Sequence, residues 1–226
     1  MGKNRSTRPV SSRGDLFSAI LLADSELGRR WAFLQPEAKA RFPGLKLKPP
    51  GNIHLTIVFI GKGWREQDLP RLKELTGLPL PEPVELVPKV ARVGRSRQVA
   101  ALDLEGLPDA IQAQVVASKR TLVAEGLKSP DAHDGTFRIH VTLAESRKPR
   151  PTMEQAKELA AFEDWVAARL ELGTLRVRLE AGTPTPLLLA GVARGESGSD
   201  YIDVDSFLER RREGSLAPHP FRSTLG

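Results

Sequence analysis

Residues 53–60 read IHLTIVFI, and residues 137–144 read FRIHVTLA. Both stretches are rich in β-branched and aromatic residues, which is typical of β-strands. Because side chains alternate across a strand, each histidine shares a face with the threonine two residues later, while the residue between them faces the core. The two stretches therefore predict two strands that each present an imidazole beside a hydroxyl. These pairs are His54 with Thr56 and His140 with Thr142.

The rest of the chain alternates short apolar strands with amphipathic helices. We expect further strands over 16–23, 84–93, 98–104, 175–181, 187–193 and 201–204, and helices after Asp24 or Ser25, over 65–76, after Asp109 and over 152–172. Pro36 should kink or end the first of these helices, and Gly173 should close the last. Strand pairs between helices favour an α+β fold with antiparallel sheets. The IHLT and IHVT segments also mark a weak long repeat.

Composition limits the chemistry. The 226 residues include no cysteine, which excludes disulfides, thiol nucleophiles and cysteine-ligated metals. The net charge is 34 − 28 = +6, and residues 1–13 hold four basic and no acidic side chains. The basic balance that would suggest a polyanion partner therefore lies mostly in this tail. No apolar run reaches the roughly 18 residues of a membrane span, so we expect a soluble, cytoplasmic protein with no membrane partner.

A histidine pair with neighbouring hydroxyls suits displacement at phosphorus. One imidazole accepts a proton from the attacking oxygen and the other donates one to the leaving oxygen, while the hydroxyls donate to the phosphate oxygens. Metal binding is the competing interpretation, but neither HxH nor HExxH occurs, so we expect no metal and no cofactor. The structural alternative is two histidines bonded to neighbouring backbone groups on half-buried strands. His133 and His219 are expected to be incidental.

The HLTI and HVTL segments resemble the two HxTx motifs of the 2H phosphoesterase superfamily, and within it the RNA 2′,3′-cyclic phosphodiesterase or 2′-5′ RNA ligase family. The resemblance covers Leu16 to Leu208, including GRSRQVAALDLEG and the final LLLAGVARGESGSDYIDV. It implies two similar α+β lobes with antiparallel sheets and outer helices, related by a pseudo-twofold, with both motifs facing a central cleft. We therefore expect a flexible tail over 1–13, a bilobal domain over 14–208 and a C-terminal tail over 209–226.

The resemblance also implies a reaction. His54 would be the general acid that protonates the leaving 3′ oxygen, and His140 the general base that activates water. Thr56 and Thr142 would hold the phosphate. The substrates would be RNA with 2′,3′-cyclic phosphate ends or cyclic nucleotides, the product a 2′-phosphomonoester, and the reverse reaction a weak 2′-5′ ligation. We expect a monomer.

The chain departs from the family pattern around the second motif. The family often has proline before the second histidine and arginine after TLA, where this chain has Ile139 and Glu145. A carboxylate facing the site would repel phosphate, so the positive charge must come from elsewhere. The candidates are Arg97, Arg138 and Arg147, and Phe137 is a candidate for stacking on a base.

Two alternatives stay open at the level of sequence. One is a non-catalytic module that binds RNA or nucleotides with the same groups. The other is a 2H phosphoesterase that acts on another cyclic phosphate, such as ADP-ribose cyclic phosphate.

Overall fold

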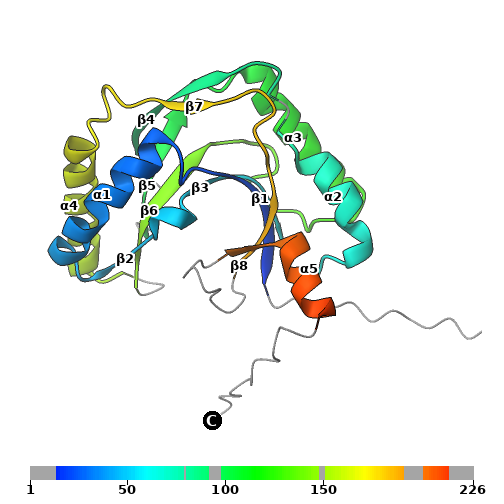
Figure 1. The fold of residues 1–226 in the computed structure, drawn as a ribbon, viewed down its shortest axis with the longest axis horizontal. Helices are drawn as coiled ribbons and strands as arrows, with labels where there is room; N and C mark the ends of the chain where they lie inside the picture. Colours follow the sequence, from blue (N-terminus) through cyan, green and yellow to red (C-terminus); the bar gives the residue numbers. More distant parts are fainter. Residues whose placement is uncertain (1–13, 79, 92–97, 148–150, 191–200, 214–226) are drawn as a thin grey trace, which may run out of the picture.

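The computed structural model describes residues 14–78, 80–91, 98–147, 151–190 and 201–213. In these ranges the chain forms two antiparallel sheets flanked by helices (Figure 1). The elements are β1 (Asp15–Leu21), α1 (Glu26–Arg41), β2 (Leu45–Leu47), η1 (Pro50–Asn52), β3 (His54–Gly61), η2 (Glu66–Asp68), α2 (Leu69–Thr76), β4 (Val84–Ala91), β5 (Val99–Glu105), α3 (Asp109–Ala124), β6 (His140–Ser146), α4 (Met153–Arg169), β7 (Val177–Leu179), β8 (Leu187–Ala190), β9 (Tyr201–Asp203) and α5 (Val204–Arg212), with η marking 3₁₀ turns. The expected α+β fold with antiparallel sheets is confirmed.

Each sheet carries one of the two histidine motifs. One sheet has the strand order β3-β1-β8-β9, and the other has the order β2-β6-β5-β4-β7. Helices α1 and α4 lie on one side of the molecule, and α2 and α3 lie together on the other (Figure 1). One large apolar core joins these layers, and within it the rings of Trp31 and Phe162 meet edge to face at 6.1 Å. This packing fixes α1 and α4 behind the strands that carry the motifs.

A smaller apolar cluster lies on the motif side of the first sheet. It comprises Phe17, Ala19 and Leu188, with Tyr201 packed against it. Phe17 and Ala19 alternate along β1 with residues of the main core, so this sheet is apolar on both faces. Nearby, the backbone N–H of Val58 donates to the Ser18 hydroxyl at 3.1 Å, where the pairing of β1 with β3 shifts register. The hydroxyl thus satisfies a donor that the irregular ladder would leave unpaired.

Several helix ends differ from expectation. Pro36 lies inside α1, which continues to Arg41 because Leu34 and Ala38, on either side of the proline, both remain packed in the core. Pro108 holds the N-cap position of α3 without a side-chain capping hydrogen bond, and the carboxylate of Asp109, the expected cap, lies in the first turn.

The second half of the chain holds the remaining differences. Helix α4 starts with the expected Thr152–Gln155 capping box but ends at Arg169, because Glu171 adopts a left-handed φ of 53° before Gly173 is reached. Strand β6 starts at His140, so Phe137 and Arg138 lie in the segment that leads into it.

The last helix extends beyond the expected end of the domain. Helix α5 runs to Arg212, past the expected boundary at residue 208, while residues 1–13 and 214–226 lie outside the described ranges. No helix in the described part of the chain is long and apolar enough to cross a membrane.

Candidate active site

The two motifs have the same pattern of burial. His54 and Thr56 are half-buried on β3, while Leu55 between them is fully buried. His140 and Thr142 repeat this pattern on β6 around the fully buried Val141. Strands β3 and β6 belong to different sheets and contact each other. The alternation expected from sequence therefore brings two imidazoles and two hydroxyls to accessible faces of neighbouring strands.

Each imidazole is tied to the backbone two residues before it. Nδ1 of His54 lies 2.8 Å from the Asn52 carbonyl oxygen, and the His140 ring makes a hydrogen bond with the backbone of Arg138. A carbonyl can only accept, so Nδ1 of His54 carries a proton and its Nε2 is left for chemistry. One nitrogen of each ring is thus committed, and the ring orientation is fixed before any ligand arrives.

Two aromatic rings hold His54 in place. The Phe17 ring centroid lies 5.2 Å from that of the imidazole, and the Tyr201 ring meets it at 4.9 Å with an interplanar angle of 81°. Phe17 and Tyr201 also pack against each other at 5.2 Å. The apolar cluster on the first sheet therefore forms a support that limits rotation of the His54 ring.

The surroundings of His140 are ionic. Asp103 of β5 stands opposite His140 in the ladder with β6, and its Oδ2 forms an ion pair with Arg138. The other carboxylate oxygen of Asp103 is buried and has no hydrogen-bond partner among the described residues. A carboxylate thus lies beside one histidine of the pair but not at the corresponding place beside the other, where Leu21 stands opposite His54.

Burial lowers the pKa of both histidines. For His54, the charges of Lys48 and His140 lower the pKa further, while the bond to the Asn52 carbonyl opposes the shift. For His140, the backbone of Arg138 and the charge of Asp103 oppose the effect of burial without cancelling it. Because a proton on His140 disfavours a second proton on His54, the pair favours states with at most one proton.

Sequence reasoning missed a lysine at this site. The ammonium of Lys48 lies 2.6 Å from a carboxylate oxygen of Glu145 and 3.3 Å from the Tyr201 hydroxyl. Glu145, which the sequence suggested would repel phosphate, is therefore paired with a cation. The only local signal was a lysine just before the turn-rich stretch PPGN, six residues ahead of His54.

The other site residues proposed from the sequence differ in position and in their contacts. Arg97 lies outside the described residues, and Arg147 is exposed. Arg138 is engaged by Asp103. Phe137 is half-buried against the core, and the ammonium of Lys119 lies 5.4 Å from its ring centroid.

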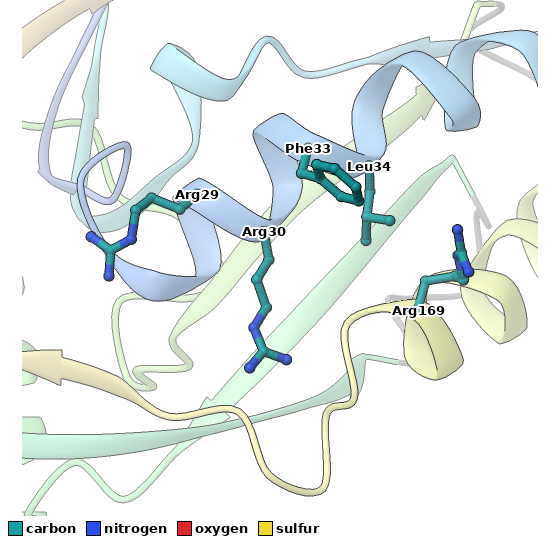
Figure 2. A pocket seen from close by; sticks show the side chains of 5 residues that line it. All are labelled: Arg29, Arg30, Phe33, Leu34 and Arg169. Atoms are coloured by element: carbon teal, nitrogen blue, oxygen red, sulfur yellow. The ribbon is translucent and has the colours of Figure 1, made fainter.

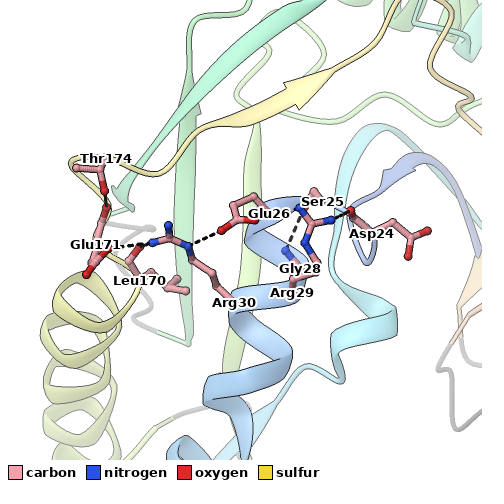
Figure 3. A network of polar contacts seen from close by, with 9 residues as sticks. All are labelled: Asp24, Ser25, Glu26, Gly28, Arg29, Arg30, Leu170, Glu171 and Thr174. Carbon is pink, nitrogen blue, oxygen red and sulfur yellow. Dashed lines mark hydrogen bonds and ion pairs between the residues drawn. The ribbon is translucent and has the colours of Figure 1, made fainter.

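Within the described ranges, no group of three or more His, Cys, Asp or Glu side chains is arranged to hold a metal ion. An open pocket of about 350 Å³ lies away from the histidines, on the outer surface of α1 and α4 (Figure 2), and is lined by Arg29, Arg30, Phe33, Leu34 and Arg169. Each of its arginines pairs with a glutamate, as Figure 3 shows for Arg29 and Arg30. Some of these surface pairs lie within α1 and others join α1 to the C-terminal end of α4. Because the charges balance, the pairs do not mark an anion site.

The chain has an α+β fold with two antiparallel sheets that each carry one motif. Comparison with known proteins confirms the resemblance to the 2H phosphoesterases. The RNA 2′,3′-cyclic phosphodiesterase of Thermus thermophilus is 28% identical over 154 residues, which cover 60% of this chain and 70% of that protein. No protein-family model matches the chain.

Solved structures support the same fold. The crystal structure of TT0787 from Thermus thermophilus matches with a TM-score of 0.50 and 21% identity, over 84% of this chain and 94% of that one. Escherichia coli LigT in its apo form matches with a TM-score of 0.51 and 19% identity over the same shares. LigT complexed with 3′-AMP gives a TM-score of 0.51 at 18% identity, over 84% of this chain and 95% of that one.

Proposed function

We propose that this chain hydrolyses 2′,3′-cyclic phosphates, at RNA ends or in small nucleotides, to 2′-phosphomonoesters without a metal or cofactor. The observation that carries the proposal is the repeated motif geometry. Two His-x-Thr pairs lie on contacting strands, and each ring is tied to the backbone two residues before it. The name of the Thermus relative supports the same class of substrate.

In the proposed mechanism, neutral His140 takes a proton from water as the water oxygen attacks phosphorus. The bond from phosphorus to the 3′ oxygen breaks, and protonated His54 gives that oxygen its proton. The product is a 2′-phosphomonoester with a free 3′ hydroxyl, and His140 ends with the proton taken from water while His54 ends neutral. Thr56 and Thr142 donate to the non-bridging oxygens, where negative charge builds up. A 5′ hydroxyl that takes the place of water in the same step would form a 2′-5′ phosphodiester, with the 3′ oxygen leaving, which is a weak 2′-5′ ligation.

The electrostatics of the pair are suited to this exchange. The low pKa of His54 makes its protonated form a strong acid toward the leaving oxygen. Charge on His140 lowers the pKa of His54, so the pair disfavours two protons at once and one ring stays neutral to act as the base. A module that only binds phosphate needs positive charge. It does not need two imidazoles that are each fixed through one nitrogen with the other nitrogen free, so this arrangement favours an enzyme.

The test is hydrolysis of adenosine 2′,3′-cyclic monophosphate in the presence of a chelator. We expect His54→Ala and His140→Ala each to lose roughly a thousandfold or more of kcat, and His133→Ala, in an exposed loop, to match the wild type. Full activity in either of the first two variants would refute the two-histidine mechanism. Binding without turnover under excess enzyme would favour a binding module, and faster turnover of ADP-ribose cyclic phosphate would change the substrate.

We further propose that the chain acts in the cytoplasm as a monomer, and that the domain expected over residues 14–208 extends to the end of α5 at Arg212. Light scattering of the full chain tests the monomer, cell fractionation the compartment, and limited proteolysis the domain boundaries.

A further inference from the structure

Lys48 lies where the chain passes from one sheet to the other. It follows the last residue of β2 and precedes η1 and β3. Its side chain is only 10% exposed. The ammonium bonds to Glu145 of β6, in one sheet, and to Tyr201 of β9, in the other. This one side chain therefore connects both halves of the site.

The position of Lys48 is also fixed through its backbone. Its N–H donates to the Leu143 carbonyl at 2.8 Å, directly after Thr142, and its own carbonyl accepts from the indole of Trp31 at 2.8 Å. Trp31 is fully buried. Because both backbone groups are engaged, the lysine cannot swing away without disturbing the core.

The Lys48 ammonium is charged, and one of its N–H donors has no partner among the described residues. Burial opposes the charge, but the hydrogen bond to Glu145 and the contact with Tyr201 outweigh it and raise the pKa of Lys48. An ammonium has three N–H donors, and two are used. The described residues provide no partner for the third. The charge is close enough to lower the pKa of His54, so the cation belongs to the same site.

The described ionic groups beside the histidines form balanced pairs. Lys48 is paired with Glu145, and Arg138 with Asp103. With both imidazoles neutral, these four side chains sum to zero charge. A cyclic phosphodiester carries one negative charge, whereas a phosphomonoester carries about −1.5 to −2 near neutral pH. The second negative charge of the monoester therefore adds less electrostatic attraction in a site whose charges balance than it would in a cationic site.

We propose that Lys48 is the phosphate-contacting cation of this site and that Glu145 is its counter-charge, which makes the site favour the singly charged cyclic diester over the doubly charged monoester. The proposal rests on the proposed function for the identity of the two ligands. It gives Glu145 a role in releasing product, and it places in Lys48 the positive charge that the sequence suggested for an arginine.

Single substitutions separate the two roles. Glu145→Gln leaves the ammonium uncompensated, so we expect adenosine 2′-monophosphate and inorganic phosphate to bind on the order of tenfold more tightly. The KM for the cyclic substrate should fall by less, because that ligand has one charge. Lys48→Met should weaken all three ligands, and Lys48→Arg should restore most of the binding.

The experiment is calorimetric titration of the full chain with adenosine 2′-monophosphate and with inorganic phosphate, at low salt and about pH 7.5, where monoesters are mostly dianionic. Lys73→Met and Asp205→Asn are matched controls, since that pair also spans 2.6 Å but is exposed and joins α2 to α5. The controls should bind like the wild type.

The proposal is overturned if Glu145→Gln binds adenosine 2′-monophosphate no more tightly than the wild type, or if a folded Lys48→Met binds it equally well. If Lys48→Met unfolds, Glu145→Gln and the double variant Lys48→Met/Glu145→Gln, which leaves no unpaired charge, decide the question. The double variant should bind both ligands weakly. Because binding needs no turnover, a protein that shows these shifts but hydrolyses no cyclic phosphate contradicts the proposed function alone.

Discussion

Asp103 stands directly opposite His140 in the β5–β6 ladder. The corresponding neighbour of His54 in the β1–β3 ladder is Leu21, which is about half exposed. The charge of Asp103 works against burial at His140, whereas the charge of Lys48 adds to burial at His54. The histidines of two motifs with matching sequences thus have different electrostatic surroundings. The difference comes from charged residues on the strands and segments beside the motifs.

Asp103→Asn should lower the pKa of His140. The substitution removes the negative charge that favours imidazolium and also releases Arg138, whose positive charge disfavours it. Both effects have the same sign. Proton–nitrogen NMR of the imidazoles across the pH range measures the change, and the exposed His133 provides an internal reference. An unchanged or raised His140 pKa would contradict the assignment of Asp103 as its electrostatic partner.

Thr142→Val should lower kcat for a 2′,3′-cyclic nucleotide by roughly a hundredfold, because an isosteric methyl cannot donate to a phosphate oxygen. Thr142→Ser keeps the donor and should stay within about tenfold of wild type. Thr56 should respond in the same way. Both threonines are only half-buried, so we expect unfolding free energies within about 0.5 kcal/mol of wild type. Equal activity in Thr142→Val and Thr142→Ser would exclude hydrogen bonding by this hydroxyl.

The parts of the site that follow from local alternation were predictable from sequence. His54 and Thr56 share a face because strand side chains alternate, and the structure confirms the burial pattern for both motifs. The antiparallel sheets also followed from strands that come in pairs between helices. These features depend on residues within a few positions of one another.

The parts that depend on distant partners were not predictable. Lys48 meets Glu145 and Tyr201 only after β2, β6 and β9 have taken their places in two sheets. Arg138 likewise appeared free to bind substrate until Asp103, 35 residues earlier, was found beside it. A single sequence carries no local signal for such pairing, because register is set by the assembled sheet.

Glu171→Gly should raise the free energy of unfolding by up to about 1 kcal/mol. Glu171 adopts a left-handed φ of 53° just after α4, a conformation that costs a residue with a Cβ roughly 1–2 kcal/mol. Its exposed ion pair with Arg30 (Figure 3) offsets little of that cost. Urea unfolding measures the effect. The matched control is Glu171→Gln, which loses the charge but keeps the Cβ and should gain nothing; a gain in the control would attribute the effect to charge.

Acidification should destabilise the wild type more than a His54→Gln/His140→Gln variant. An unfolded histidine titrates near 6.5, and the folded chain lowers both values. As pH falls from about 6.5 through the folded pKa values, the unfolded chain binds more protons than the folded one, so the free energy of unfolding drops in that window. Each pKa unit by which the folded value of a histidine lies below its unfolded value corresponds to about 1.4 kcal/mol of unfolding free energy. Urea unfolding of both proteins at a series of pH values measures the difference between them, in which the contribution of the carboxylates cancels. If the unfolding free energies of the two proteins changed with pH in parallel, the folded chain would not favour the neutral forms of these histidines.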